Sequence, residues 1–238
     1  MNDPWAEANE GDSYYVSVTD MLIGLLFLFI IMLMYFAVQL RTTTEALITA
    51  DQTRSELLAK MVDYMQRNDV KAEADFEAGV LRLPNEILFE KSRDTPNPAG
   101  QYALQTLARA FGEYLPCYAF SPDPRPDTCG KQSPHRLEAI FIEGHTDSDP
   151  LMGNERLRDN WDLSAARAAN TYRLITAFAP QISDFSSAPP ESDDAKPLMS
   201  VAGYADQRPV ALGDDEASKA RNRRIDIRFI MAGPKPAE

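Results

Sequence analysis

The first forty residues of this 238-residue chain contain no lysine or arginine. A secretory signal peptide begins with a basic segment and carries only a short apolar stretch. Here the apolar stretch is too long for a signal peptide, and acids precede it, namely Asp3, Glu7, Glu10 and Asp12. We therefore expect this stretch to stay in the protein as a membrane anchor.

Residues that commonly bind metals or catalyse reactions are also scarce. His135 and His145 are the only two histidines, and cysteine likewise occurs twice. A zinc site needs a larger cluster of such ligands. The chain also lacks the glycine-flanked serine of hydrolases, the glycine loop that binds nucleotide phosphates and the paired histidines of metalloproteases. These absences predict a protein that is not an enzyme and that has no metal or cofactor.

Positive charge is in deficit as well. The 24 lysines and arginines are outnumbered by 36 acids, which gives a formal net charge of -12. Such a chain binds polyanions poorly, because the phosphates of nucleic acids repel it. The short basic cluster of Arg221, Arg223 and Arg224 is therefore not expected to bind nucleic acid.

The most prominent feature that is present is a long apolar segment, which predicts a transmembrane helix at residues 14–40. Residues 21–38 carry no charge, and about 18 such residues suffice to cross a bilayer. One acid, Asp20, lies near the start, roughly 8 to 9 Å inside the first interface at a rise of about 1.5 Å per residue. An acid at that depth normally faces a protein partner or a water-filled path, so Asp20 is a candidate for carrying protons or other ions.

The neighbours of Asp20 allow two interpretations. Gly24 lies one turn further along, where the missing side chain lets another helix approach closely. The alternative is that Asp20 marks the aqueous end of a shorter span, with Tyr14 and Tyr15 at the membrane interface. In either case we expect residues 1–13 to form a short, polar, cytoplasmic tail.

Cys117 and Cys129 lie in a proline-rich stretch, within reach of each other across a short loop. A local disulfide of this kind is typical of an oxidising compartment. The alternative is a pair of free thiols in a loop.

Residues 41–76 are expected to link the membrane helix to a folded domain. From Arg41 to Asn68 there is no glycine or proline, and apolar residues recur at helical spacing. These residues are Leu57, Leu58, Met61, Val62 and Met65. Such a juxtamembrane helix can pair with its copy in a homodimer, lie on the membrane surface or act as a spacer.

The remainder of the chain, residues 77–231, alternates between strand and helix patterns. Strands are expected at residues 79–83, 137–143, 198–204 and 224–231, with a further extended segment at 86–90, and helices at 97–115 and 162–178, with a short one before the last strand. This order predicts an α/β domain, of the α+β kind, with helices packed on a sheet. Residues 232–238 are expected to be a disordered tail.

Four short motifs in this region occur in the same order as in one protein family. They are Ile-Glu-Gly-His-Thr-Asp at 142–147, Asn-Trp-Asp-Leu-Ser-Ala-Ala-Arg-Ala at 160–168, Val-Ala-Gly-Tyr-Ala-Asp at 201–206 and Asn-Arg-Arg-Ile-Asp at 222–226. In combination they resemble the peptidoglycan-binding domain that OmpA, Pal and the flagellar stator protein MotB share. The resemblance implies a βαβαβ domain that binds the diaminopimelate-bearing stem peptide of the cell wall.

The same resemblance points to Asp147 and Arg167 as the ligand-binding pair, with Asn160, Thr146 and Arg223 as further binding residues. Diaminopimelate carries an ammonium beside a carboxylate, so an acid and a base at a fixed separation suit it. Arginine can hold a carboxylate through two parallel hydrogen bonds. The first turn of the helix that begins near Asn160 adds backbone N–H groups for the same carboxylate.

Simpler roles remain open for several of these residues. Asp147 can cap a turn, Arg167 can be a solvated helix residue, and Asn160 or Ser164 can be an N-cap. Arg223, like its neighbour Arg224, can brace the fold or the rim of the groove.

One stretch departs from the family pattern. The loop at residues 149–159 is longer than is usual in the family, so it can cover or reshape the binding groove.

The membrane segment carries a resemblance of its own, because residues 19–29 are similar to the corresponding segment of MotB-type stator B subunits. This implies a wall-bound homodimer, a multi-span A-type partner that forms a pentamer, and transport of H⁺ or Na⁺ through Asp20. It also implies a single-pass protein of the bacterial inner membrane whose C-terminal domain is periplasmic. Arg41, the first basic residue, would by itself favour a cytoplasmic domain.

The choice within the stator family rests on the N-terminal tail. Flagellar stator B subunits usually carry a basic tail, whereas this one is short and acidic. The tail, the cysteine loop and the modest length resemble the B subunits of Zorya anti-phage defence systems. The alternatives are a flagellar stator subunit and a static tether between membrane and wall without ion flow.

Overall fold

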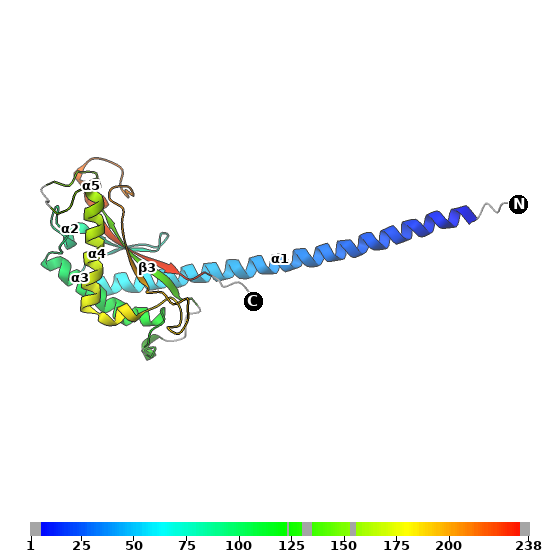
Figure 1. The fold of residues 1–238 in the computed structure, drawn as a ribbon, viewed down its shortest axis with the longest axis horizontal. Coiled ribbons are helices and arrows are strands. Elements are labelled where there is room, and N and C mark those ends of the chain that lie inside the picture. Colours follow the sequence, from blue (N-terminus) through cyan, green and yellow to red (C-terminus); the bar gives the residue numbers. More distant parts are fainter. Residues whose placement is uncertain (1–5, 123, 130–134, 153–155, 234–238) are drawn as a thin grey trace. The chain divides into compact units, whose positions relative to one another are not determined.

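The computed structural model describes residues 6–122, 124–129, 135–152 and 156–233 (Figure 1). The described residues divide into two compact units, residues 6–48 and residues 49–233. Helix α1 (Ala6–Arg67) contributes residues to both. Within the expected tail at residues 1–13, the chain is already helical from Ala6 onward. Residues 1–5 and 234–238, in the two expected tails, lie outside the described residues.

In the first unit, the apolar segment of α1 has no covering surface. All described side chains from Tyr15 to Leu40 are exposed. The described residues contain one helix that is long and apolar enough to cross a membrane, and it is this one. Apolar surface of this extent is unfavourable in water, so the segment needs lipid or protein around it. This agrees with the expected membrane anchor.

The last third of α1 belongs to the core of the second unit. Leu57, Leu58, Met61 and Met65 are fully buried there, together with residues of the sheet and of the other helices. The helical spacing is confirmed, and of the three roles considered, the structure contradicts an apolar face turned to a second copy or to the membrane surface. The apolar face of the helix packs against its own domain.

The second unit is built on a five-stranded sheet with the strand order β1-β2-β5-β3-β4. The strands are β1 (Glu73–Asp75), β2 (Val80–Pro84), β3 (Leu137–His145), β4 (Met199–Gly203) and β5 (Arg224–Met231). Strands β3 and β4 are parallel, and the other neighbours are antiparallel. The last strand thus lies in the middle of the sheet, which confirms the expected α+β class.

Helices cover one face of this sheet (Figure 1). Besides the end of α1, the helices of this unit are α2 (Asn85–Leu88), α3 (Pro98–Tyr114), α4 (Asn160–Phe178) and α5 (Glu216–Asn222), with 3₁₀ turns η1 (Leu115–Cys117), η2 (Asp127–Cys129) and η3 (Pro180–Asp184). The two long helices, α3 and α4, contact each other, and α4 lies against β3 and β4. Asn97 caps α3 by accepting a hydrogen bond from the Gly100 N–H at 2.8 Å.

Two elements differ from the expectation. Residues 86–90 were expected to be extended, but most of them form the single helical turn α2, which buries Leu88 and hydrogen-bonds Asn85 N–H to the Arg223 carbonyl. Strand β1 was not expected, because its three residues, two of them acidic, carry no apolar alternation.

The two faces of the sheet differ in chemistry, and β5 shows this along its length. Ile225, Ile227 and Phe229 are buried in the hydrophobic core, where the Phe229 ring meets the Phe111 ring edge-on at 6.1 Å. The alternate residues of β5, Arg224, Asp226 and Arg228, point to the opposite face. There they form a network of ion pairs with neighbouring strands.

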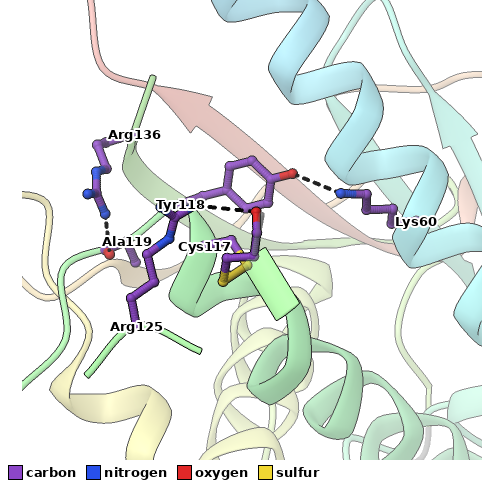
Figure 2. Close-up of a disulfide and its surroundings, with 7 residues drawn as sticks. Lys60, Cys117, Tyr118, Ala119, Arg125 and Arg136 are labelled. Carbon is purple, nitrogen blue, oxygen red and sulfur yellow. Dashed lines mark hydrogen bonds between the residues drawn. A yellow bond between two sulfur atoms is a disulfide. The ribbon is translucent and has the colours of Figure 1, made fainter. Parts of the chain in front are cut away.

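The expected disulfide between Cys117 and Cys129 is confirmed (Figure 2). The Cα atoms lie 5.2 Å apart, within the usual range for such a bond. Beside it, Tyr118 accepts a hydrogen bond on its hydroxyl from the Lys60 ammonium at 3.3 Å. The disulfide thus closes a loop that is also attached to the end of α1.

Candidate functional site

The site lies where β3 ends and α4 begins, and two glycines let these elements approach closely. A Cβ atom on Gly144 would lie 2.1 Å from the carbonyl oxygen of Ser164, and one on Gly203 would lie 2.5 Å from the backbone nitrogen of Ala165. The Ser164 hydroxyl accepts a hydrogen bond from the Ala205 N–H at 3.0 Å. The residues after β3 are therefore held directly against the first turns of α4.

A cavity of about 170 Å³ opens at this junction. The five residues that the sequence analysis assigned to the peptidoglycan site, Thr146, Asp147, Asn160, Arg167 and Arg223, all line it. They come from the end of β3, from α4 and from the residue before β5. The fold thus brings together side chains that are up to 77 positions apart in the chain, the separation between Thr146 and Arg223.

Asp147 is nearly buried, and its carboxylate is already occupied. Its Oδ2 lies 2.7 Å from Nη1 of Arg223, and its Oδ1 accepts a hydrogen bond from the Asp149 N–H at 3.2 Å. Arg223 also contacts Glu216 at 2.6 Å and Glu86 at 3.4 Å. Although burial opposes its charge, the bonds to Asp147 and Glu216 raise the pKa of Arg223. Asp147 is thus an ion-pair partner rather than a simple turn cap.

Arg167 is 2% exposed, so it is not a solvated helix residue. Its guanidinium donates to the carbonyls of Arg93 at 2.8 Å and Glu90 at 3.3 Å, and it stacks over the Phe89 ring. Burial lowers the pKa of Arg167 to about 10, while the nearby carboxylate of Asp147 opposes this shift. Arg167 therefore stays positively charged at neutral pH and supplies a fixed cation to the cavity.

Asn160 and Thr146 complete the set of predicted residues. Asn160 is not the N-cap of α4; Asp159 has that role, and its side chain accepts from the Asp162 N–H. The Asn160 amide instead donates to the carbonyls of Asp147 and Asp149, at 3.2 and 2.9 Å. The Thr146 hydroxyl is buried and has no hydrogen-bond partner within the described part of the chain, so it is available to a ligand.

The start of the long loop lies on the cavity. Asp149, Pro150 and Leu151 line it, and Lys219 of α5 holds Asp149 through an ion pair of 2.7 Å. This hydrogen bond to Lys219 lowers the pKa of the Asp149 carboxyl. The loop therefore shapes the cavity wall, as the sequence analysis allowed, while residues 153–155 lie outside the described residues.

The charges of the lining are mixed. Three cations and four acids contribute, namely Lys91, Arg167 and Arg223, with Glu86, Asp147, Asp149 and Glu216. Such a cavity suits a small ligand that carries both an ammonium and a carboxylate. Glu86, Glu216 and Lys219 could not be predicted, because nothing in their local sequence indicates that they lie beside the predicted residues.

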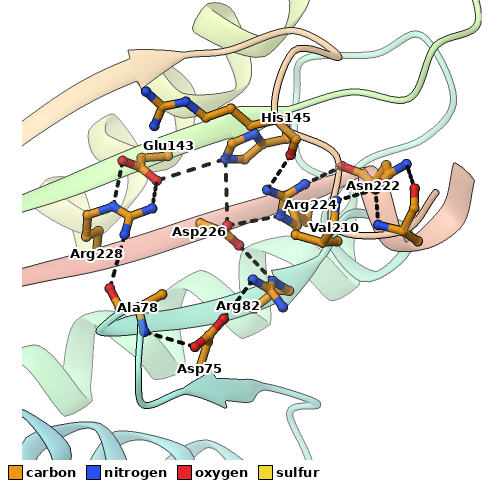
Figure 3. Close-up of polar contacts among 12 residues, drawn as sticks. Asp75, Ala78, Arg82, Glu143, His145, Val210, Asn222, Arg224, Asp226 and Arg228 are labelled. Carbon is orange, nitrogen blue, oxygen red and sulfur yellow. Dashed lines mark hydrogen bonds and ion pairs between the residues drawn. The ribbon is translucent and has the colours of Figure 1, made fainter. Parts of the chain in front are cut away.

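A buried ionic network lies on the polar face of the sheet (Figure 3). Arg228 binds Glu143 at 2.8 Å, and Asp226 binds Arg224 at 3.0 Å and Arg82 at 3.2 Å. His145 lies among these groups and stacks on the Tyr204 ring. Burial, followed by the charge of Arg224, lowers the pKa of His145 to about 3, so its ring is neutral at physiological pH.

Three members of this network have the geometry of metal ligands. Ligand atoms of Glu143, His145 and Asp226 lie within 4.8 Å of one another. Both carboxylates, however, already bind arginines, and the positive charges that lower the pKa of His145 also repel a metal cation. We therefore interpret the cluster as part of the fold.

The apolar N-terminal helix and the sheet domain define the class of protein by fold alone: the sheet domain resembles that of a solved MotB-like protein. Among solved structures, a MotB-like protein from Desulfovibrio vulgaris has a TM-score of 0.53 and 22% identity, with 76% of this chain and 96% of that chain covered. The cell-wall anchor of the type VI secretion system (T6SS) from Pseudomonas aeruginosa gives a TM-score of 0.48 and 20% identity, with 76% and 99% covered. At 22% identity, the similarity to the Desulfovibrio vulgaris protein supports a shared fold and no further property.

Sequence comparison adds one relative. The uncharacterized protein YtxE of Bacillus subtilis (strain 168) is 26% identical over 181 residues, which are 74% of this chain and 60% of that protein. The chain thus spans less than two thirds of the length of this relative. No family model matches the chain.

Proposed function

We propose that this chain is the wall-anchoring B subunit of an ion-driven stator in the bacterial inner membrane. The observation that carries the proposal is the cavity at the end of β3, in a domain with the MotB-like fold. It supplies a buried acid, Asp147, and a fixed cation, Arg167, as a ligand with adjacent ammonium and carboxylate groups requires. We infer that this ligand is the diaminopimelate of the peptidoglycan stem peptide, and that the domain is periplasmic.

The membrane half of the proposal depends on Asp20. Its side chain is exposed on the apolar helix and has no hydrogen-bond or ion-pair partner among the described residues. A carboxylate within a membrane is stable only when it is protonated or paired with a cation or polar group. Alternation between these states, against a multi-span A-type subunit, would let H⁺ or Na⁺ cross, and each charge gains about 2.3 kcal/mol per 100 mV.

The assembly we propose is a homodimer anchored in the wall that drives a surrounding pentamer of the A-type subunit. The acidic residues before the apolar helix and the loop closed by Cys117 and Cys129 support a role in Zorya anti-phage defence over a flagellar role. A gene for a large multi-span protein beside a helicase-like gene would agree with defence, whereas flagellar neighbours would indicate motility.

The wall-binding step is tested by co-sedimentation of the full-length, detergent-solubilised protein with purified sacculi. Asp147→Ala and Arg167→Lys should abolish or strongly reduce binding, because lysine keeps the charge but not the planar pair of donors. Glu138→Ala removes an exposed acid elsewhere on β3 and is the matched control. Undiminished binding by both site variants would rule out this cavity as the wall site.

The rival function is a static tether, and Asp20 separates it from the stator. A tether needs wall binding but no ion flow, so Asp20→Asn would leave its function intact. The stator requires that the same variant assembles normally and loses activity.

A further inference from the structure

A second hollow, of about 160 Å³, lies beside the first cavity, and its lining is strongly basic. Five cationic side chains and two acids line it, namely Lys71, Arg82, Arg221, Arg223 and Arg224, with Glu73 and Glu86. Three of the arginines are already paired with carboxylates: Arg82 and Arg224 share Asp226, and Arg223 binds Asp147 and Glu216. The attraction for an anion therefore depends on the cations that remain unpaired.

Two of these cations are held rigidly. Arg224 is 3% exposed and donates to Asp226 at 3.0 Å and to the carbonyls of Asn222 and Arg208 at 3.2 and 3.0 Å. Arg82 donates to the same Asp226 carboxylate at 3.2 Å. The base of the hollow is thus ordered before any ligand arrives, which reduces the entropy lost on binding.

Two other cations are uncommitted. Lys71, just before β1, and Arg221, in α5, are exposed and have no hydrogen-bond or ion-pair partner among the described residues. They come from opposite ends of the domain sequence but line the same hollow. Their charges are therefore available to an incoming anion.

Arg223 connects this hollow with the first cavity, because its side chain lines both. Its guanidinium donates one hydrogen bond to Asp147 and others to Glu216 and Glu86. An anion in the basic hollow would offer the same guanidinium a competing acceptor.

We propose that the basic hollow binds an oxyanion, either a phosphate or a carboxylate group, and that the bound anion draws Arg223 away from Asp147. Arginine and lysine side chains bind both kinds of oxyanion through charge-assisted hydrogen bonds. Release of Asp147 then leaves its carboxylate free for the ammonium of a ligand in the first cavity. This second step rests on the proposed function, whereas anion binding itself does not.

Anion binding is tested with inorganic phosphate and the full-length protein in a phosphorus-free detergent. The measurement is the broadening of the ³¹P resonance during titration at constant ionic strength. Lys71→Gln with Arg221→Gln should weaken phosphate binding by roughly tenfold or more, because two uncompensated charges are lost. Lys196→Gln with Arg109→Gln removes two exposed cations elsewhere in the domain and should leave the affinity unchanged.

Two results would overturn the anion site. One is the absence of saturable broadening in the unaltered protein, and the other is an equal loss of affinity in both double variants, which would indicate screening by overall charge. Competition by glutarate distinguishes the two sources of anion: displacement of phosphate at comparable concentration favours carboxylates, and no displacement favours phosphate.

The coupling is tested separately, through binding of the protein to sacculi with and without saturating phosphate. Phosphate should increase binding of the unaltered protein but not of the Lys71→Gln, Arg221→Gln variant. Phosphate binding without any change in wall binding would disprove the coupling. Absence of wall binding under all conditions would count against the proposed function and leave the ³¹P result standing.

Discussion

Asp20 and Asp147 are the two acids on which the proposed function depends, and their surroundings are opposite. Asp20 lies on an exposed apolar helix and has no partner among the described residues. Asp147 is 8% exposed and is bound by Arg223 and by a backbone N–H. A carboxylate placed in an apolar segment needs a partner from another molecule. A carboxylate that is already paired, such as Asp147, needs a ligand that can replace its partner. We therefore expect Asp20 to contact another protein and Asp147 to contact a ligand of the cavity.

The sharpest test of this contrast is Asp20→Asn. Because the amide cannot exchange a proton, we expect complete loss of ion flux when the chain is reconstituted with its A-type partner, with unchanged co-purification of the two proteins. Asp63→Asn, at an exposed acid on the same helix, is the control. Normal flux in the Asp20 variant would remove the acid from the mechanism and favour the static tether.

On the domain side of the contrast, Arg167→Ala should cost about 3 kcal/mol of unfolding free energy. The change leaves a void over Phe89 and removes the donors that satisfy the carbonyls of Arg93 and Glu90. Arg173→Ala, at an exposed arginine of the same helix, should change stability by no more than about 0.5 kcal/mol. Denaturant unfolding of the full-length protein measures both, and similar values for the two variants would contradict the buried role of Arg167.

The next largest expected effect is the loss of stability when the disulfide is removed. Replacement of both Cys117 and Cys129 by serine should cost about 2 to 3 kcal/mol, because the unfolded chain regains the freedom of a loop with a separation of 12 residues. Thermal unfolding with and without a reductant measures it. A reductant should lower the melting temperature of the unaltered protein to that of the double variant and leave the variant unchanged.

The smallest of these effects concerns pH and the polar face of the sheet. Burial holds the pKa of His145 at about 3 in the folded state, against an ordinary value near 6.5. The stabilisation by the neutral ring is complete above pH 6.5. It falls as the pH drops toward 3, because only the unfolded chain takes up the proton, and the loss should reach about 2 kcal/mol at pH 5.

This dependence is measured by denaturant unfolding between pH 7.5 and 5. His145→Gln cannot titrate, so its stability should change less over the same range. An identical slope in both proteins would assign the pH dependence to other groups.

Much of the domain could be predicted because its patterns are local. Strand patterns predicted β2, β3, β4 and β5, and helical patterns predicted α3 and α4. Helical spacing identified Leu57 and Met61 as a buried face, but spacing does not reveal what covers a face, and the covering surface turned out to be the domain's own core.

The candidate site was likewise predicted only in part. The motif resemblance placed Asp147 and Arg167 in one cavity, and the structure agrees on their location. The pairing of Asp147 with Arg223 joins positions 76 residues apart, and their local sequences contain no signal for it. The resemblance likewise named Arg223 as a binding residue without indicating that a second hollow lies on its other side.

The two faces of the sheet imply opposite responses to temperature. Contacts around Phe229 are hydrophobic, and their contribution weakens on cooling. The ion pairs around Asp226 respond in the other direction, since the cost of dehydrating charges falls as temperature rises. A domain built from both should therefore keep its sheet intact over a wider thermal range than either kind of contact alone would allow.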